Sequence, residues 1–181
     1  MDSSSFVSKE DYESQKDFAK AMMGTFNVRL GQSRVASITY GEYSEKVLQF
    51  DSYRSVDDIE SLIYSARSVG GLPRLHKALI NASDIMKDAN SSFPGIVILF
   101  AVARQGSDID EKAIESAAEK LHDLGVRVYV ITVGKASDLK VLDFVADHPQ
   151  DVFTVPSFRD LVSRQEDIAK NIFMRVGKFL I

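Results

Sequence analysis

The spacing of apolar residues along the chain changes repeatedly between the period of a helix and that of a strand. In residues 8–26 the apolar side chains recur at helical spacing, which predicts a helix, and Ser8 followed by Asp11 forms a capping pair at its start. The same reasoning predicts further helices that begin at Ser55 and at Ser157 and that span Leu75–Ala89, Asp110–Leu124 and Ser137–Ala146.

Strands are predicted by two other patterns. Residues 96–102 and 126–133 are predominantly apolar and rich in branched side chains, which is typical of strands covered on both faces of a parallel sheet. Residues 35–40 and 46–50, joined by a glycine-containing turn, predict a β-hairpin, and Val152–Val155 predicts a further short strand.

The order of these elements predicts an α/β fold. Helices and strands alternate with short breaks along the 181 residues, so we expect one domain over residues 1–175, followed by a strand-like tail at residues 176–181. The expected architecture is a three-layer sandwich in which helices cover both faces of a mostly parallel central sheet. One antiparallel hairpin strand is expected at the edge of that sheet.

Composition and charge exclude several classes of protein. The hydrophobic fraction of 45% is ordinary for a globular domain, and no apolar run approaches the roughly 18–20 residues of a bilayer span, so no membrane insertion is expected. The net charge of −4 is spread along the chain and provides no basic face for nucleic acid. The absence of cysteine excludes disulfides and cysteine–zinc sites, and the polar start does not resemble a signal peptide.

The sequence contains no recognisable pattern of catalytic residues. The histidines His76, His122 and His148 lie in different predicted elements without metal-ligand spacing. Ser3–Ser5 are not part of a Gly-x-Ser-x-Gly elbow, and the Gly70-Gly71 pair is not part of a phosphate-binding loop. We therefore predict that the protein is not an enzyme and uses no cofactor.

Several motifs occur in a familiar order and spacing. They are Asp2-Ser3-Ser4-Ser5 before the first helix, the hairpin region 34–50, the Gly70-Gly71 turn before RLHKAL, and the stretches GIVILFAVARQGSD and LHDLGVRVYVITVGKA. Together they resemble the von Willebrand factor A domain, most strongly the repeated A domains of type VI collagen and the matrilins. The resemblance covers about Asp2 to Phe173 and implies the same three-layer, Rossmann-like sandwich.

Members of this family are known for a metal-ion-dependent adhesion site at the carboxyl ends of the parallel strands. An Asp-x-Ser-x-Ser loop, a threonine and an aspartate surround one Mg²⁺, a hard cation that prefers oxygen ligands. The resemblance places Asp2 and Ser4 at the first two ligand positions. It places Phe6 at the second serine, Pro73 at the threonine and Val102 at the aspartate, and none of these three side chains carries oxygen.

We therefore expect a degenerate adhesion site that binds no metal. Asp108 and Asp110 follow the strand that ends near Val102, and we expect them to cap the next helix rather than to replace the missing aspartate.

The resemblance also implies a difference at the two ends of the chain. In the family, the first parallel strand precedes the Asp-x-Ser loop, whereas only Met1 precedes Asp2 here. A five-residue central strand contributes about 10 kcal/mol through burial of its side chains. One hypothesis is that Phe179–Ile181 of the tail pairs within the sheet and fills this slot. The alternatives are a piece of a tandem array, a frayed tail and an extension of the last helix.

The resemblance implies a non-catalytic protein–protein interaction module of a secreted extracellular-matrix or adhesion protein. Its expected partners are matrix proteins or collagen, with self-association in a tandem array as a further option. The alternative is an intracellular A-domain scaffold in a multiprotein complex. An α/β enzyme or phospho-receiver is less favoured, because a receiver needs clustered acids where the strand end at Val102 is apolar.

Two triplets have the sequence of an N-glycosylation acceptor. Asn90 begins one of them in a polar stretch before a predicted strand, and Asn81 begins the other in the middle of a predicted helix. Asn90 is the favoured site if the protein is secreted.

Overall fold

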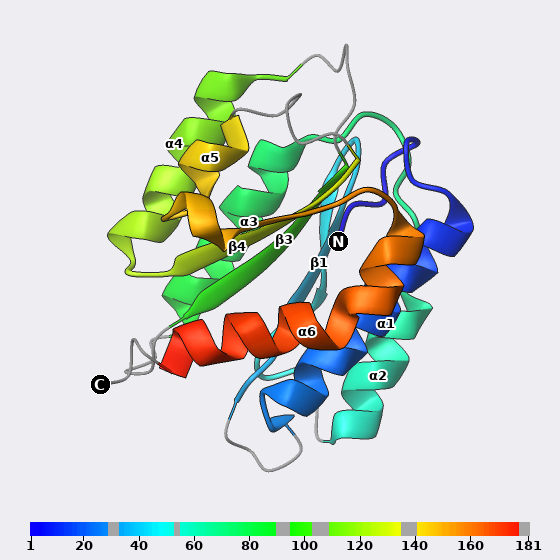
Figure 1. Cartoon of the computed structure of the whole chain (residues 1–181). Helices are drawn as coiled ribbons and strands as arrows, with labels where there is room; N and C mark the ends of the chain where they lie inside the picture. Colours follow the sequence, from blue (N-terminus) through cyan, green and yellow to red (C-terminus); the bar gives the residue numbers. More distant parts are fainter. Residues whose placement is uncertain (29–32, 53–54, 90–94, 103–108, 135–140, 178–181) are drawn as a thin grey trace.

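The computed structural model of the 181-residue chain describes residues 1–28, 33–52, 55–89, 95–102, 109–134 and 141–177 (Figure 1). The helices are α1 (Lys9–Thr25), α2 (Val56–Ser65), α3 (Leu75–Asp88), α4 (Glu111–Asp123), α5 (Val141–Val145) and α6 (Phe158–Gly177). The strands are β1 (Ser37–Tyr40), β2 (Ser44–Leu48), β3 (Ile96–Val102), β4 (Arg127–Val133) and β5 (Val152–Val155), the last preceded by a short 3₁₀ turn at Pro149–Asp151.

The strands form a parallel sheet and a hairpin, as predicted. β3, β4 and β5 lie side by side in that order and run parallel, with Ile96 opposite Arg127. β1 and β2 pair antiparallel. Among the described residues no ladder joins β1 to β3, so the hairpin is a sheet of its own; Asp2 forms a parallel bridge with Tyr40 at the end of β1.

Helices cover both sides of these strands, which confirms the three-layer sandwich (Figure 1). α3 packs on α4 and α4 packs on α5 on one side, while α1 packs on α6 on the other. α2 contacts α1 and β2. No helix among the described residues is long and apolar enough to cross a membrane.

The almost continuous apolar run of β4 follows from its place in the middle layer. Val128 and Val130 pack in the core beneath α3 and α4, whereas Tyr129 and Ile131 pack in the core beneath α1 and α6. Successive side chains of a strand point to opposite faces, so a strand covered on both faces needs apolar residues at consecutive positions.

The predicted capping residues lie where the sequence pattern indicated. Ser8 accepts a hydrogen bond from the backbone N–H of Asp11 at the start of α1. Ser55 and Asp58 form a reciprocal capping box at α2. Asp110 caps α4, as expected, whereas Asp108 lies outside the described residues. α5 is described only from Val141, so the predicted start of that helix at Ser137 lies outside them as well.

One buried ion cluster connects the far edge of the sheet to α6. Asp151 is fully buried and accepts two hydrogen bonds from Arg127, at 2.8 and 3.0 Å, and one from Arg175 at 3.2 Å. The two guanidinium groups compensate the buried negative charge of Asp151. Removing this carboxylate would deprive the largely buried guanidinium of Arg127 of this charged partner.

We predict that Asp151→Ala lowers the free energy of unfolding by about 3–5 kcal/mol, because breaking a buried ion pair leaves a desolvated charge. The matched control is Glu166→Ala, which removes the exposed pair between Glu166 and Lys170 and is expected to cost less than about 0.5 kcal/mol. Urea unfolding of both variants measures the difference. A loss as small for Asp151→Ala as for the control would contradict the structural role of the cluster.

Candidate functional site

The predicted site lies where β1 and β3 end and the N-terminal segment crosses between them. The backbone of Asp2 is fixed by Gln15 of α1, whose amide accepts from the Asp2 N–H and donates to the Asp2 carbonyl, both at 2.7 Å. Both side chains are buried. This paired contact aims the Asp2 carboxylate at the end of β3.

The Asp2 carboxylate is used inside the protein. Its Oδ1 accepts from the backbone N–H of Ser4 at 2.9 Å, and its Oδ2 accepts from the backbone N–H of Val102 at 3.3 Å. Burial raises the pKa of this carboxyl group, and the hydrogen bonds from Ser4 and Val102 offset part of that shift. The carboxylate therefore joins the N-terminal loop to the last residue of β3.

Hydroxyl groups behind Asp2 form a continuous buried chain. The Tyr12 hydroxyl donates to Thr39 Oγ1 at 2.8 Å, Thr39 donates to Ser3 Oγ at 2.9 Å, and Ser3 donates to the Tyr40 carbonyl at 3.0 Å. Ser3 Oγ also accepts from the Val69 N–H at 3.1 Å. In such a chain each hydrogen bond polarises the next, so the group acts as one structural unit.

The double-glycine turn is attached to the same loop. Gly70 and Gly71 have φ values of 72° and 69°, in the left-handed region that glycine adopts without strain. The Gly70 N–H donates to the Ser3 carbonyl at 2.9 Å, and the Gly71 N–H donates to Ser5 Oγ at 2.8 Å. Ser3 and Ser5 therefore hold this turn against the N-terminal segment.

Three of the five predicted positions line one small cavity. Asp2, Pro73 and Val102 surround about 30 Å³, a volume close to that of one water molecule. The cavity is otherwise bounded by Tyr40 and by apolar side chains, namely Leu75, Ala101, Ile109, Ile114, Val141 and Leu142. Ser4 is buried beside Asp2, while Phe6 is half-buried and lies outside the lining of this cavity.

A scan against protein families matches the von Willebrand factor type A domain over residues 1–167. The chain belongs to the von Willebrand factor type A domain family. This finding confirms the resemblance that the motifs indicated.

The related proteins are large. A von Willebrand factor A domain-containing protein 2 from Xenopus laevis is 24% identical over 95% of this chain, which spans 22% of that protein. The human collagen alpha-6(VI) chain is 21% identical over 98% of this chain, which spans 8% of it. Matrilin-3 from Gallus gallus is 24% identical over 87% of this chain, which spans 36% of it. The A domain described here thus corresponds to a minor part of each relative.

Solved structures show the same fold. Proximal thread matrix protein 1 from the mussel byssus matches with a TM-score of 0.82 and 22% identity over 93% of this chain and 44% of that one. A second structure of that protein, described with a zinc-occupied MIDAS motif, matches with a TM-score of 0.81 and 21% identity. At this level of identity the similarity shows the fold of the A domain and not the chemistry of its site.

The described residues at the five positions do not supply the ligand shell of a magnesium ion. Mg²⁺ demands a nearly octahedral shell of oxygen ligands. At the five positions the side chains offer one carboxylate, from Asp2, and one hydroxyl, from Ser4, and both oxygens of the carboxylate already accept backbone N–H groups. Among the described residues, no three His, Cys, Asp or Glu side chains are grouped so that they could hold a metal.

Other predicted residues are dispersed through the domain. His76 and His122 lie on α3 and α4, and His148 precedes the 3₁₀ turn, so the three do not form a cluster. The Asn81 side-chain nitrogen, to which a glycan would attach, donates to the carbonyl of Ser44 at 3.2 Å and to its hydroxyl at 2.9 Å. Asn90 lies outside the described residues.

Several residues that organise the site were not singled out from the sequence. Gln15 and Thr39 are buried polar residues, on α1 and β1, and Tyr12 is buried on α1 together with apolar side chains. The usable signal was polarity at positions where the helical or strand period predicts burial. Gln15 shows this most clearly, because it lies one turn after Tyr12 and has no exposed surface.

We predict that Mg²⁺ or Mn²⁺ leaves the melting temperature of this A domain unchanged, because an ion that does not bind the folded state cannot stabilise it. The positive control is the triple variant Phe6→Ser, Pro73→Thr, Val102→Asp, which restores oxygen at the three apolar positions and is expected to melt at a higher temperature with metal than without. Calorimetry with and without a chelator measures both proteins. A metal-dependent rise in the melting temperature of the unmodified chain would contradict the conclusion that these positions do not bind the ion.

The buried Tyr40 gives an alkaline pH dependence. Its hydroxyl donates to the Phe100 carbonyl at 2.6 Å, and burial, reinforced by the negative charge of Asp2, raises its pKa well above the ordinary 10. Because the folded-state pKa exceeds the unfolded one, the contribution of Tyr40 to stability is complete below pH 10 and is lost as the pH rises further.

We therefore predict that the unmodified chain loses stability above about pH 10 more steeply than Tyr40→Phe does. The variant itself is expected to be less stable at neutral pH by about 1–2 kcal/mol, because the Phe100 carbonyl loses its donor. Chemical unfolding at a series of pH values compares the two proteins, which share all other tyrosines. Parallel pH profiles would contradict a pKa of Tyr40 that is raised in the folded domain.

Proposed function

We propose that this A domain is a non-catalytic protein–protein interaction module of a secreted extracellular-matrix or adhesion protein, and that it binds its partners without a metal ion. The observation that carries the proposal is the state of the Asp2 carboxylate, which accepts from Ser4 and Val102 beside two apolar positions, Pro73 and Val102. A carboxylate engaged in this way supports the structure of the loop edge rather than ligand coordination.

The names of the relatives support the class of partner. Collagen type VI chains, matrilin-3 and a matrix protein of the mussel byssus all carry this fold, and these names describe proteins of extracellular matrices. The proposed partners are accordingly matrix proteins or collagen, including further copies of the same domain in an array. On this proposal Asn90 is the favoured glycosylation site, since the Asn81 amide is engaged with Ser44.

The loops at the carboxyl ends of the strands provide the proposed contact surface. Tyr43, at the tip of the hairpin, is 51% exposed. Next to it, the Glu42 carboxylate lies 3.5 Å from the Arg74 guanidinium and accepts from the Leu72 N–H at 3.0 Å, and Lys77 donates to the Glu42 carbonyl. An exposed aromatic ring beside mixed charges on a braced loop is typical of the energetic centre of a protein interface.

We predict that the domain binds immobilised type VI collagen microfibrils equally well with Mg²⁺ and with a chelator, and that Tyr43→Ala weakens this binding about tenfold or more. Surface plasmon resonance measures both effects. Met174→Ala is the matched control, because Met174 is also an exposed large apolar residue, at 59%, but lies near the end of α6 and away from these loops.

The outcomes separate the parts of the proposal. Loss of binding in the chelator would contradict the metal-independent mode. An equal effect of the two alanine variants would contradict the loop surface, and no binding of the unmodified domain would contradict the proposed partner.

A further inference from the structure

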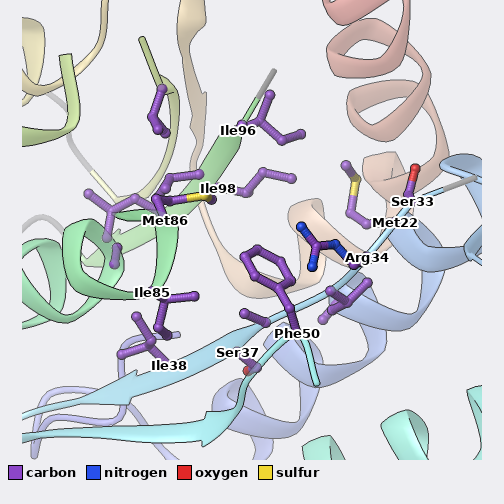
Figure 2. Close-up of a pocket in the computed structure, with 18 of the residues that line it drawn as sticks. Met22, Ser33, Arg34, Ser37, Ile38, Phe50, Ile85, Met86, Ile96 and Ile98 are labelled. Carbon is purple, nitrogen blue, oxygen red and sulfur yellow. The ribbon is translucent and has the colours of Figure 1, made fainter. Parts of the chain in front are cut away.

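A long apolar groove lies between the hairpin and the parallel sheet. It has a volume of about 940 Å³ and is lined by side chains of β1, β3, α3 and the segment that follows β2. Figure 2 shows Ile38 of β1 and Ile98 of β3 at this groove, with Met86 and Phe50 pointing into the same space. The groove is larger than the cavity near Asp2 by more than an order of magnitude and has no part in the proposed contact surface.

Backbone hydrogen bonds show that residues 1–3 pair with β1 as a short strand at one end of the groove. The Met1 amine donates to the Ile38 carbonyl at 2.7 Å, the Tyr40 N–H donates to the Met1 carbonyl at 3.0 Å, and the Ser3 N–H donates to the Tyr40 carbonyl at 2.8 Å. This alternation between two chains is that of a parallel ladder. Since Asp2 also reaches Val102 on the other side, residues 1–3 run between β1 and β3.

The two flanking strands, β1 and β3, are buried next to residues 1–3 and become more exposed beyond them. Thr39 and Tyr40 at the end of β1 are buried, as are residues 99–101 of β3, which lie beside Met1 and Asp2. Towards their amino ends the strands become half-exposed, at residues 37–38 and 96–98. The paired positions of β4, by contrast, are fully buried from Val128 onwards. The described residues therefore leave the part of the groove beyond Met1 uncovered.

Lys178–Ile181 lie outside the described residues, and we propose that they enter this groove as a strand between β1 and β3, parallel to both. α6 is described up to Gly177, and the side chains of Phe173 and Val176 in its last two described turns line the groove. Val176 also packs in the same core cluster as Ile96, the first residue of β3. Four extended residues span about 13 Å, enough to lead from this end of the groove towards Met1.

The path of the chain favours this connection. The crossovers from β3 to β4 and from β4 to β5 pass through α4 and α5 on one side of the sheet. A connection from β5 back to the groove runs in the opposite direction across the sheet, and its helix, α6, packs with α1 on the opposite side. Because this connection reverses both the direction of travel across the sheet and the side on which its helix lies, it has the same handedness as the other two crossovers. Crossover connections between parallel strands are right-handed in about 98% of cases.

The chemistry of the segment matches the groove. A strand between β1 and β3 is covered on both faces, and Phe179, Leu180 and Ile181 are consecutive apolar residues of the kind such strands need. Lys178 would lie at the mouth of the groove, where its ammonium group stays in water. The same segment of a second copy has identical chemistry, but a segment joined directly to α6 has a millimolar effective concentration that a separate copy does not reach at ordinary protein concentrations.

Engineered disulfides test the proposal directly, because the chain contains no cysteine of its own. Leu180→Cys is combined in one protein with Ser37→Cys and in another with Ile38→Cys, and both are oxidised and run on a non-reducing gel. Neighbouring strand positions point to opposite faces, so we expect one of the two pairs, and not both, to close as a monomer with the mass of an internal disulfide. Met174→Cys with the same two partners is the control and is expected to stay reduced.

Each alternative has its own result. A covalent dimer would show that a second copy supplies the strand, which overturns the internal arrangement. Absence of any bond, or equal bonding to both positions, would overturn the strand itself.

A substitution provides an independent measurement. Leu180→Asp is expected to lower the melting temperature by about 5 °C or more, because it buries a charge in the apolar groove, whereas Met174→Asp on the exposed side of α6 is expected to leave it nearly unchanged. Equal melting temperatures for Leu180→Asp and the unmodified chain would overturn the proposal. Neither measurement involves matrix binding, so its result is separate from the test of the proposed function.

Discussion

The connection between the two sheets depends on the buried carboxylate of Asp2. Its backbone pairs with Tyr40 on β1 and its side chain accepts from Val102 on β3, so one residue spans the boundary between hairpin and parallel sheet. The Tyr40 hydroxyl crosses the same boundary to the Phe100 carbonyl. Gln15, Ser3 and the double-glycine turn are arranged around this point, and each loses its geometry if the boundary opens.

This arrangement shows how the N-terminal loop and the double-glycine turn are held together although Phe6, Pro73 and Val102, at three positions that the resemblance assigns to ligands, carry no side-chain oxygen. Asp2 directs its oxygens at backbone N–H groups, so its charge is balanced by hydrogen bonds within the protein. Ser3 and Ser5 have also become structural, since their hydroxyls hold the turn at residues 69–71. At this edge, the N-terminal loop and the double-glycine turn are therefore joined by hydrogen bonds within the protein.

The sequence predicts the fold better than the site, for a physical reason. The apolar runs of β3 and β5 and the caps at Ser8, Ser55 and Asp110 are local patterns, and the structure has them where they were predicted. The roles of Asp2 and Gln15 depend on contacts between distant segments, such as the 100 residues that separate Asp2 from Val102. A motif alignment places Asp2 at a ligand position, but only the structure shows which groups its oxygens face.

The groove illustrates the same difference. The strand-like composition of the tail is visible in the sequence, whereas the space between β1 and β3 follows from the way the hairpin is docked. Consecutive branched residues at 96–98 predict a strand covered on both sides. In the structure these residues are half-exposed, because among the described residues no strand pairs with this part of β3 on the side of the hairpin.

The packing of α1 against α6 has a consequence for how the domain is made. These are the first and last helices that the structure describes, and together they cover the side of the sheet that contains Tyr129 and Ile131. The cover of that side is complete only when residues about 150 positions apart in the sequence have met, so a partly folded domain without α6 exposes apolar surface that favours association with other chains.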